Sequence, residues 1–260
     1  TSSAFTVGNG TRQGGILSPC LFNRYIYDLL LLVSRQKVGC NIGGVFANVF
    51  AYADDIVLLA PSWQALQALL RVLENGILAI DMSCNTRKTV CMVFSPRQKR
   101  KVVSPHFPPL RLFGTDLLYV DNFKYLGHII DNKLNDDADI QREIRNLFTR
   151  ANILTRRFSL CSQSVKVALF KSYCISLYGC ALWRNHTVSS LSKLRSCYHR
   201  CVKTFFGYKR HDSMTAVLFK LSIPSFNTLL HNSRCILRSQ TVNCINSLLQ
   251  ACCNRVAAII

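Results

Sequence analysis

Apolar residues recur every three or four positions in several long stretches of the chain, the spacing that lines one face of a helix. Ser18 and Pro19 begin the first stretch, and Pro61 and Ser62 begin the second; these residue types are favoured at helix starts. We therefore expect helices over residues 18–35, 62–82, 136–159, 163–184, 187–206 and 213–221, and a weaker one over 226–250.

Short apolar runs rich in β-branched and aromatic residues predict strands. Gly114 and Thr115 are expected to form the turn of a hairpin, and Gly127 lies inside the last strand, where another backbone can come close. The predicted strands cover residues 3–7, 46–50, 56–59, 90–94, 110–113, 117–120 and 123–130.

The order of these elements predicts two domains. Residues 1–131 mix strands and helices, which indicates an α+β fold with an antiparallel sheet and packed helices, while residues 132–260 are expected to be helical throughout. Residues 96–109 are rich in proline and basic side chains and are expected to form an exposed loop.

Two adjacent carboxylates, Asp54 and Asp55, lie between two of the predicted strands. Only residues 52–55 are polar enough to turn there, so the carboxylates are expected at the tip of a hairpin. Like charges side by side in a partly desolvated turn repel each other, and one would take up a proton unless a cation compensated them. A divalent metal ion is therefore the ligand that this turn predicts.

A glycine-rich loop and a single lysine are weaker candidates for a binding site. Arg12 and Gln13 precede Gly14 and Gly15, so a phosphate-seeking guanidinium and an amide lie beside a backbone that a ligand can approach closely. Lys88 lies just before a predicted strand. Taken alone, the glycine-rich segment is also compatible with an ordinary loop before a core helix, and Lys88 is also compatible with a surface lysine.

The thirteen cysteines are odd in number and scattered along the chain, which favours free thiols over a disulfide framework. Cys197, His199 and Cys201 follow one another at intervals of two in a helical stretch. Residues two apart on a helix point to different faces, so the three side chains cannot converge on one ion, which argues against a zinc site. No apolar run reaches the roughly 18 residues that a membrane span needs, and no secretory leader is recognisable. We expect a protein of the nucleus or cytoplasm that is neither secreted nor bound to a membrane.

Positive charge is concentrated in the second half of the chain. Residues 1–140 contain fourteen Lys and Arg against eleven Asp and Glu, a net charge of +3, whereas residues 141–260 contain eighteen against two, a net charge of +16. So uneven a distribution is typical of a surface that meets a polyanion. Because the bases are spread over several helices, they favour tracking of a phosphate backbone over membrane binding, although a merely solvated basic face remains the alternative.

Four motifs occur in order along the chain: Gly10-Thr11-Arg12-Gln13-Gly14-Gly15-Ile16-Leu17-Ser18-Pro19-Cys20-Leu21-Phe22, Tyr52-Ala53-Asp54-Asp55, Asn85-x-x-Lys88-Thr89 and Lys124-Tyr125-Leu126-Gly127. In order and spacing this series resembles the successive palm motifs of reverse transcriptases. The Tyr-Leu-Gly block and the basic helical tail resemble the non-LTR (LINE-type) retrotransposon enzymes, the jockey-like group in particular, and the resemblance covers essentially the whole chain.

The resemblance implies an RNA-directed DNA polymerase that extends a DNA primer on an RNA template from dNTPs, using two Mg²⁺ ions or alternatively Mn²⁺. It implies that Asp54 and Asp55 are catalytic metal ligands and that Lys88 acts near the triphosphate as a proton donor to pyrophosphate. The other implied roles are nucleotide and template binding by Arg12, Gln13 and Gly14, contact with the primer end by Tyr52 and Ala53, and a primer grip at Tyr125, Leu126 and Gly127. The helical half would be a thumb that holds the RNA–DNA duplex by its phosphates through Arg142, Arg145, Arg150, Arg156, Arg157, Lys166 and Lys171.

One departure from the family pattern concerns the metal site. The family also uses an aspartate on an earlier palm strand, which would lie before Thr1, and no acidic residue precedes Asp28. Two carboxylates do not supply the ligands that two octahedral cations take. We therefore expect a palm-and-thumb fragment without polymerase activity of its own; robust primer extension by the chain alone would refute this. The endonuclease domain and zinc knuckle of some relatives are also absent from the sequence.

Two alternatives stay open at this point. A group II intron-like reverse transcriptase shares the Tyr-Ala-Asp-Asp motif, and a non-catalytic nucleic-acid-binding remnant would keep the basic helices without copying a template. All three hypotheses predict binding to an RNA–DNA duplex that weakens steeply with salt. The sequence predicts no particular protein partner.

Overall fold

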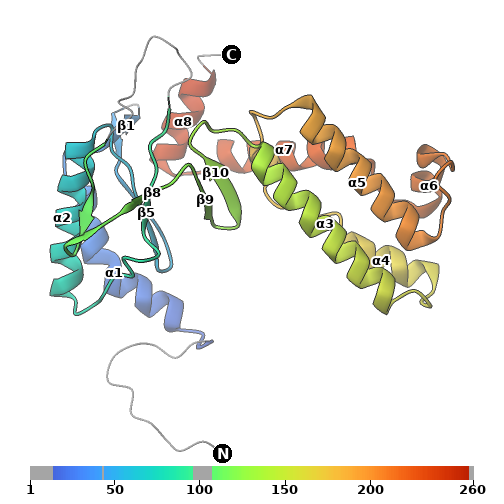
Figure 1. Ribbon diagram of the computed structural model, residues 1–260, viewed down its shortest axis with the longest axis horizontal. Helices are drawn as coiled ribbons and strands as arrows, with labels where there is room; N and C mark the ends of the chain where they lie inside the picture. Colours follow the sequence, from blue (N-terminus) through green and yellow to red (C-terminus); the bar gives the residue numbers. More distant parts are fainter. Residues whose placement is uncertain (1–13, 43, 96–106, 258–260) are drawn as a thin grey trace, which may run out of the picture. The chain divides into compact units, whose positions relative to one another are not determined.

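The computed structural model describes residues 14–42, 44–95 and 107–257 (Figure 1). They form two compact units. The mixed unit contains the described residues up to 91 together with 107–119 and 245–257, and the helical unit contains 92–95 and 120–244. These units are defined by packing; the boundary between functional domains at residues 131 and 132 stays a prediction.

The mixed unit combines helices with short strand pairs. Its helices are α1 (Ser18–Ser34), α2 (Trp63–Ala79) and α8 (Ser247–Ala257). Its strands are β1 (Cys40–Ile42), β2 (Val45–Ala47), β3 (Val49–Tyr52), β4 (Asp55–Leu58), β5 (Val90–Cys91), β6 (Arg111–Leu112), β7 (Thr115–Asp116) and β8 (Leu118–Tyr119). The pairs β1–β2, β3–β4 and β6–β7 are antiparallel.

The predicted α+β class is confirmed, although the strands differ in detail from the expected antiparallel sheet. In the part of the chain that the structure describes, they pair two by two, and the pair β5–β8 is parallel. A parallel pair needs a long crossover, which the chain between β5 and β8 provides. The turn of the β6–β7 hairpin is Phe113–Gly114, one residue earlier than predicted, since both residues have positive φ angles, 49° and 70°.

Helices α1 and α2 pack together and form the base on which the β3–β4 hairpin lies. Ser62 caps α2 as predicted, because its hydroxyl accepts a hydrogen bond from the Ala65 N–H at 3.2 Å. Helix α1 begins at Ser18, as expected, with Leu17 at the N-cap position. The core between the two helices and the hairpin is built from Leu29, Val33, Leu69, Leu73 and Ile77.

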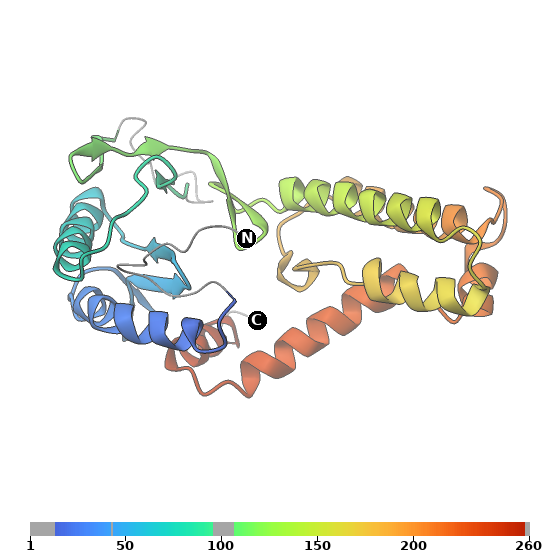
Figure 2. The ribbon, with the colours of Figure 1, turned by 90° about the horizontal axis from the view of Figure 1, so that it is seen from below.

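The helical unit begins with a hairpin of β9 (Asn122–Tyr125) and β10 (His128–Asp131). It continues with α3 (Asp137–Arg157), α4 (Gln163–Tyr173), the 3-10 turn η1 (Cys180–Leu182), α5 (Val188–Phe206), α6 (Met214–Leu221) and α7 (Phe226–Val242). Helix α3 packs along α5 and against α4 (Figures 1 and 2). Its buried residues Ile140, Leu147, Ala151 and Leu154 recur at helical spacing and form one side of the core.

Three predicted elements of this region are corrected. The strand expected over residues 123–130 is the β9–β10 hairpin, the helix expected over 163–184 ends at Tyr173, and the weak helix over 226–250 ends at Val242. Helix α4 ends with Cys174 at its C-cap position, and Gly179, with a left-handed φ of +76°, precedes the separate 3-10 turn η1.

The cysteines described by the structure are free thiols, as their spacing predicted. Cys197 and Cys201 lie one turn apart on α5 with their Sγ atoms 4.0 Å from each other. Within residues 14–42, 44–95 and 107–257, no group of three or more His, Cys, Asp or Glu side chains is arranged to hold a metal ion. Over the same residues, no helix has both the length and the apolar composition that crossing a bilayer requires.

Candidate functional site

Asp54 and Asp55 lie at the tip of the β3–β4 hairpin, where the sequence predicted them. Tyr52 pairs with Asp55, so that Ala53 and Asp54 alone form the loop between the strands. Ala53 has a φ of +51°, a left-handed conformation that a two-residue hairpin loop demands and that an L-residue adopts at a cost of about 1–2 kcal/mol. The motif is therefore a tight and geometrically constrained turn.

The two faces of this hairpin have different environments. Side chains alternate between the faces of a strand. Val49, Ile56 and Leu58 pack against the α1–α2 core, while Tyr52 and Asp55 form a cross-strand pair on the opposite face and are exposed. The apolar residues on either side of the motif thus fix the hairpin and leave its tip open to a ligand.

The two carboxylates are available for ligand binding. Asp54 and Asp55 are both exposed, and neither carboxylate makes a hydrogen bond or an ion pair with any residue that the structure describes. Carboxylate oxygens are the ligands that Mg²⁺ prefers, so this pair fits a divalent cation. The described residues place no third side chain of this kind beside them, so further ligands must come from elsewhere.

Asn48, which the sequence analysis did not single out, fixes the start of this hairpin. It is buried, and its side-chain amide lies within hydrogen-bonding distance of four carbonyl oxygens at the end of α1 and just after it. Those oxygens belong to Val33, Ser34, Gln36 and Val38, at distances of 3.0–3.3 Å. A polar residue inside an apolar run is the signal that could have revealed this role, because a buried amide requires hydrogen-bond partners.

The remaining predicted residues of the mixed unit lie in turns. Lys88 is exposed and ends a turn that Asn85 organises, since the Asn85 side chain accepts a hydrogen bond from the Lys88 N–H at 3.2 Å. Gly14 is exposed, has a φ of +80° and has open space around it. Arg12 and Gln13 lie outside the described residues.

The Tyr-Leu-Gly motif forms the turn of the β9–β10 hairpin in the helical unit. Tyr125 pairs with His128, and the two loop residues Leu126 and Gly127 have φ angles of +44° and +84°. Gly127 is thus a turn residue, which corrects its predicted place inside a strand. Positive φ at both loop positions is the geometry whose twist matches that of the flanking strands.

Residues of the following helical segments hold this turn in place. The Tyr178 hydroxyl donates to the Leu126 carbonyl at 2.9 Å, and the Tyr178 ring stacks on His128 with ring centroids 4.9 Å apart. A Cβ atom at Gly127 would come within 3.0 Å of the Tyr178 ring. The position of the Tyr-Leu-Gly turn therefore depends on contacts with residues outside the motif, which the motif itself does not predict.

Asp139 connects the same hairpin to α3 and η1. Its carboxylate is 2% exposed and accepts hydrogen bonds from the Ile129 N–H at 2.9 Å, Arg142 Nε at 2.6 Å and Trp183 Nε1 at 2.8 Å. Burial raises the pKa of Asp139, but the bonds from Arg142, Ile129 and Trp183 outweigh it and lower the pKa to about 2. Asp139 is therefore a charged anchor between three elements of the helical unit.

Two of the predicted phosphate-binding bases form ion pairs with buried carboxylates inside the helical unit. The Arg142 side chain is 11% exposed and pairs with Asp139 and Glu143, and Arg150 pairs with the fully buried Glu143. Neither guanidinium is free to contact a phosphate without breaking a buried ion pair, so we withdraw Arg142 and Arg150 from the proposed contacts. The charge count of the sequence could not distinguish them from surface bases.

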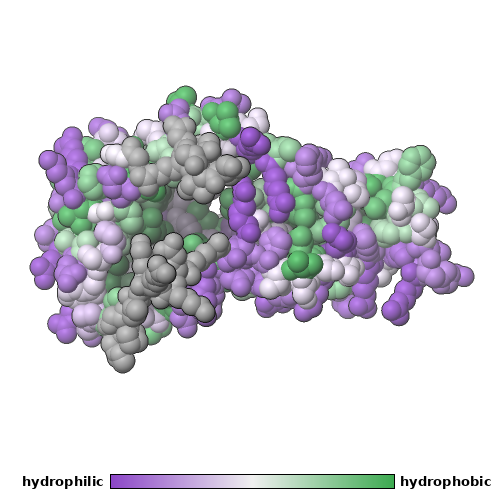
Figure 3. All heavy atoms as spheres, turned by 90° about the horizontal axis from the view of Figure 1, so that it is seen from above, coloured by the Kyte–Doolittle hydropathy of each residue, from purple (hydrophilic) through white to green (hydrophobic). Residues whose placement is uncertain are grey.

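The other predicted bases remain candidates. Arg145, Arg156, Arg157 and Lys171 are exposed, and the half-buried Lys166 has its Nζ 5.9 Å from the centre of the Phe205 ring. Figure 3 shows hydrophilic side chains gathered on the visible face of the helical unit, with hydrophobic ones among them. These four exposed bases are therefore open to an anionic ligand.

Comparison with known proteins agrees with the motifs. A family model described as reverse transcriptase (RNA-dependent DNA polymerase) matches residues 1–130, half of the chain. The Pol polyprotein of the retrotransposable element R2 from Nasonia vitripennis is 33% identical over 144 residues, which are 51% of this chain and 14% of that protein. The RNA-directed DNA polymerase of the mobile element jockey from Drosophila funebris is 25% identical over 222 residues, 79% of this chain and 23% of that protein.

The chain therefore belongs to the reverse transcriptase family. Its relatives include polymerases of the R2 and jockey elements, which confirms the predicted resemblance to the non-LTR retrotransposon enzymes. The chain spans less than a quarter of the length of these relatives.

Proposed function

We propose that this chain forms the palm and thumb part of an RNA-directed DNA polymerase that, within a longer protein, extends a DNA primer on an RNA template. The observation that carries the proposal is the exposed, unpaired Asp54–Asp55 pair at the tip of a tight hairpin in a chain of the reverse transcriptase family. The ligands are the template, the primer and a dNTP, and the site of action is the nucleus or cytoplasm.

The metal site and the triphosphate contact are assigned to three exposed residues. Asp54 and Asp55 hold divalent cations, Mg²⁺ or Mn²⁺, together with ligands from outside the described residues. Such ions supply positive charge at the attacking and leaving oxygens of an in-line displacement. Lys88, which is exposed, neutralises the triphosphate and gives a proton to the departing pyrophosphate.

Residues in several turns and helices position the substrates. Tyr52, on the same face of the hairpin as Asp55, and Ala53 contact the primer end, while Tyr125, Leu126 and Gly127 grip the primer strand. Arg12, Gln13 and Gly14 contact the incoming nucleotide and the template. The exposed bases Arg145, Arg156, Arg157 and Lys171, with Lys166, contact duplex phosphates, a mode that tolerates any template sequence.

The test is primer extension by a longer polypeptide that contains this chain, with an RNA template, a DNA primer, dNTPs and Mg²⁺. Asp54→Asn and Asp55→Asn should each slow synthesis by at least about 10²-fold, because a metal contributes several kcal/mol to the transition state and 1.36 kcal/mol is tenfold in rate. Asp116→Asn, which alters an exposed carboxylate of β7, is the matched control and should leave the rate unchanged. Undiminished synthesis by both Asp54 and Asp55 variants would refute the proposal.

A nucleic-acid-binding role without catalysis is the second candidate, favoured by the lack of a third metal-binding side chain among the described residues. The same assay separates the two candidates, since that role predicts duplex binding without synthesis by the longer polypeptide. The expectation that the chain alone does not polymerise stays a prediction, and including it in the assay tests it.

A further inference from the structure

A short turn connects α3 to α4 at one end of the helical unit (Figure 2). Phe158 packs against the core of the unit, and the Cys161 N–H donates to the Phe158 carbonyl oxygen at 3.3 Å. Ser159 and Leu160 therefore form the outer corner of the turn. Both residues are exposed, Leu160 by 100%, so this leucine contributes nothing to the core.

Two arginines precede this turn at the end of α3. Arg156 and Arg157 lie three and two residues before Ser159, and Ser159 is the only serine or threonine of the sequence with arginine at both of these positions. Both arginines are exposed, and across the described part of the chain neither forms an ion pair. The carboxylates of another protein can therefore reach both guanidinium groups.

The Ser159 hydroxyl is equally accessible. Its Oγ makes no hydrogen bond with any residue that the structure describes, whereas the Oγ atoms of Ser162 and Ser164 lie 3.1 Å from each other. Arg157 is the last residue of α3, so a short segment from Arg156 to Leu160 can leave the fold by opening one helical turn. Helix ends open at a low free-energy cost, because few contacts hold them.

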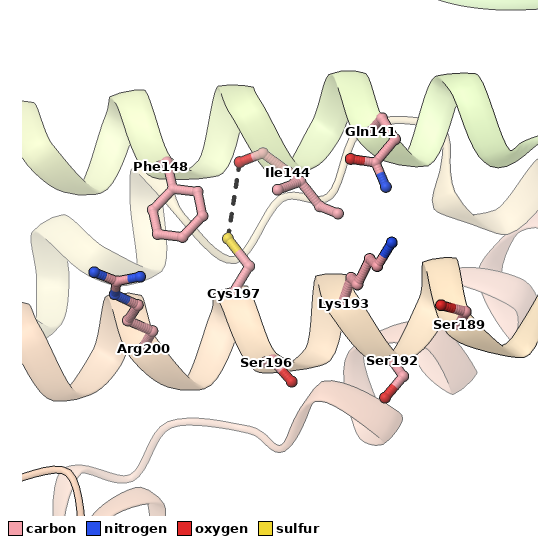
Figure 4. Close-up of a pocket in the computed structure, with 9 residues that line it drawn as sticks. All are labelled: Gln141, Ile144, Phe148, Ser189, Ser192, Lys193, Ser196, Cys197 and Arg200. Atoms are coloured by element: carbon pink, nitrogen blue, oxygen red, sulfur yellow. Dashed lines mark hydrogen bonds between the residues drawn. The ribbon is translucent and has the colours of Figure 1, made fainter.

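Ser196 shows why the place in the fold matters. It is exposed on α5 and points away from α3 (Figure 4), and it follows Lys193 by three residues and Arg195 by one. It lies, however, in the middle of Val188–Phe206, a helix whose opposite face is buried. An enzyme that needs an extended segment would have to unwind this helix to reach Ser196, whereas the turn after α3 is already non-helical.

We infer that Ser159 is a phosphorylation site for an arginine-directed serine kinase. The acidic cleft of such a kinase pairs with Arg156 and Arg157, and an apolar pocket takes the exposed Leu160. The Ser159 Oγ attacks the γ-phosphorus of a nucleoside triphosphate, the bond from that phosphorus to the bridging oxygen breaks, and the nucleoside diphosphate leaves. The hydroxyl proton passes to a carboxylate base of the kinase.

The phosphoryl group also changes the charge of this end of the helical unit. It carries about −1.5 to −2 charges at pH 7, which offsets the two positive charges of Arg156 and Arg157. Both arginines are among the proposed contacts with duplex phosphates, so phosphorylation weakens that binding. This regulatory consequence rests on the proposed function, whereas the modification of Ser159 does not.

The test of the modification incubates the whole chain with ATP, Mg²⁺ and the purified catalytic subunit of cyclic AMP-dependent protein kinase, an arginine-directed enzyme. Mass spectrometry locates the phosphate. The unaltered chain should carry it on Ser159. Ser159→Ala should lose this incorporation, and Ser196→Ala, the matched control at another exposed serine, should keep it.

Two double variants that remove the same charge test how the site is recognised. Arg156→Gln with Arg157→Gln should lower kcat/KM of the kinase for this chain at least about tenfold, because two charge-assisted contacts are lost. Lys209→Gln with Arg210→Gln alters two exposed bases after α5 and should leave kcat/KM unchanged. Thermal unfolding of each variant should match that of the unaltered chain.

The regulatory consequence is measured by fluorescence anisotropy with a labelled RNA–DNA duplex at about 100 mM salt. The phosphorylated chain should bind at least about tenfold more weakly than Ser159→Ala treated with the same kinase. The inference is overturned if the unaltered chain takes up no phosphate at Ser159, if the arginine variant is phosphorylated at the unaltered rate, or if phosphorylation leaves duplex binding unchanged. A chain that does not bind the duplex before phosphorylation refutes the proposed duplex contacts, while phosphate incorporation at Ser159 still decides the modification.

Discussion

Replacing Asp139 by asparagine should loosen the whole junction between the β9–β10 hairpin, α3 and η1. Ile129 donates to Oδ1 of Asp139 and Trp183 donates to Oδ2, so the single oxygen of asparagine can accept from only one of them. Asparagine also removes the charge that faces Arg142 at 2.6 Å. Arg142 would then be left with Glu143, which it already shares with Arg150.

The expected cost follows from the burial of the pair. Removing one partner of a buried ion pair lowers the free energy of unfolding by about 3–5 kcal/mol, because the other charge stays buried without compensation. The pKa of Asp139, lowered from 3.8 to about 2, independently corresponds to roughly 2 kcal/mol of stability from the charged form. We therefore expect Asp139→Asn to lose about 3 kcal/mol.

The pH dependence gives this prediction a second readout. Because the pKa is lower in the folded state, the stabilisation is present above the unfolded value of about 3.8 and is lost as the pH falls through about 2. About half of it should be gone at pH 3. Asp139→Asn should lack this part of the acid sensitivity between pH 6 and pH 3.

The assay is urea denaturation followed by circular dichroism at both pH values. Asp116→Asn is the matched control, since Asp116 also pairs with an arginine, Arg111 at 2.8 Å, but at a site where the two side chains are 56% and 67% exposed. That exposed pair should contribute no more than about 1 kcal/mol. Equal losses for the two variants, or a loss below about 1 kcal/mol for Asp139→Asn, would refute the assignment of Asp139 as an anchor.

Three further predictions concern backbone and packing and are measured by thermal unfolding of the chain. Gly179→Ala should lower the free energy of unfolding by about 1–3 kcal/mol more than Gly207→Ala. Both glycines have φ near +75°, but a Cβ at Gly179 would overlap the His128 imidazole, while Gly207 has open space around it. Equal losses for the two variants would contradict the clash. Ala53→Val should lower the free energy of unfolding by more than about 1 kcal/mol, because a β-branched residue tolerates positive φ poorly, whereas Ala53→Gly should not lower it. A greater loss for glycine than for valine would show that the turn is not left-handed. Asn48→Ala should lower the free energy of unfolding by about 2 kcal/mol or more, because it leaves carbonyl oxygens without hydrogen-bond donors. Asn41→Ala, at an exposed position, should lower it little. Similar losses for the two variants would argue against a buried amide that anchors the hairpin.

The Asp54–Asp55 hairpin and α2 were predictable because their signals are local. Two polar residues between apolar runs must turn, and a serine before an amphipathic stretch caps a helix. Both inferences needed only neighbouring residues and the period of the pattern, and both match the structure.

The turn at Leu126 and Gly127 was not predictable from the same kind of signal. Its flanking residues are apolar or aromatic on both sides, which is typical of one continuous strand, and Leu126 adopts a positive φ that leucine rarely takes. The partner that stabilises the turn, Tyr178, lies 52 residues further along the chain. A local pattern cannot contain that information.

The excess of basic residues in the second half of the chain was predictable from the sequence. Which of these bases are exposed was not. Arg142 and Arg150 contribute to the net charge of the sequence just as Lys193 does, but they neutralise buried carboxylates in the fold. Which bases face solvent depends on the packing of α3 against α5, and a count of charges does not include that packing.

The Tyr-Leu-Gly turn also has a consequence for the order of synthesis. The chain leaves the ribosome from its N-terminus, so Leu126 emerges well before Tyr178 and Trp183, which complete its support. Until those residues have been made, the nascent hairpin lacks both the hydroxyl that holds its turn and the indole that completes its anchor at Asp139. A ribosome that stalls between α4 and η1 would therefore present a Tyr-Leu-Gly loop whose position is not yet fixed, and the turn would be held in place only after η1 docks.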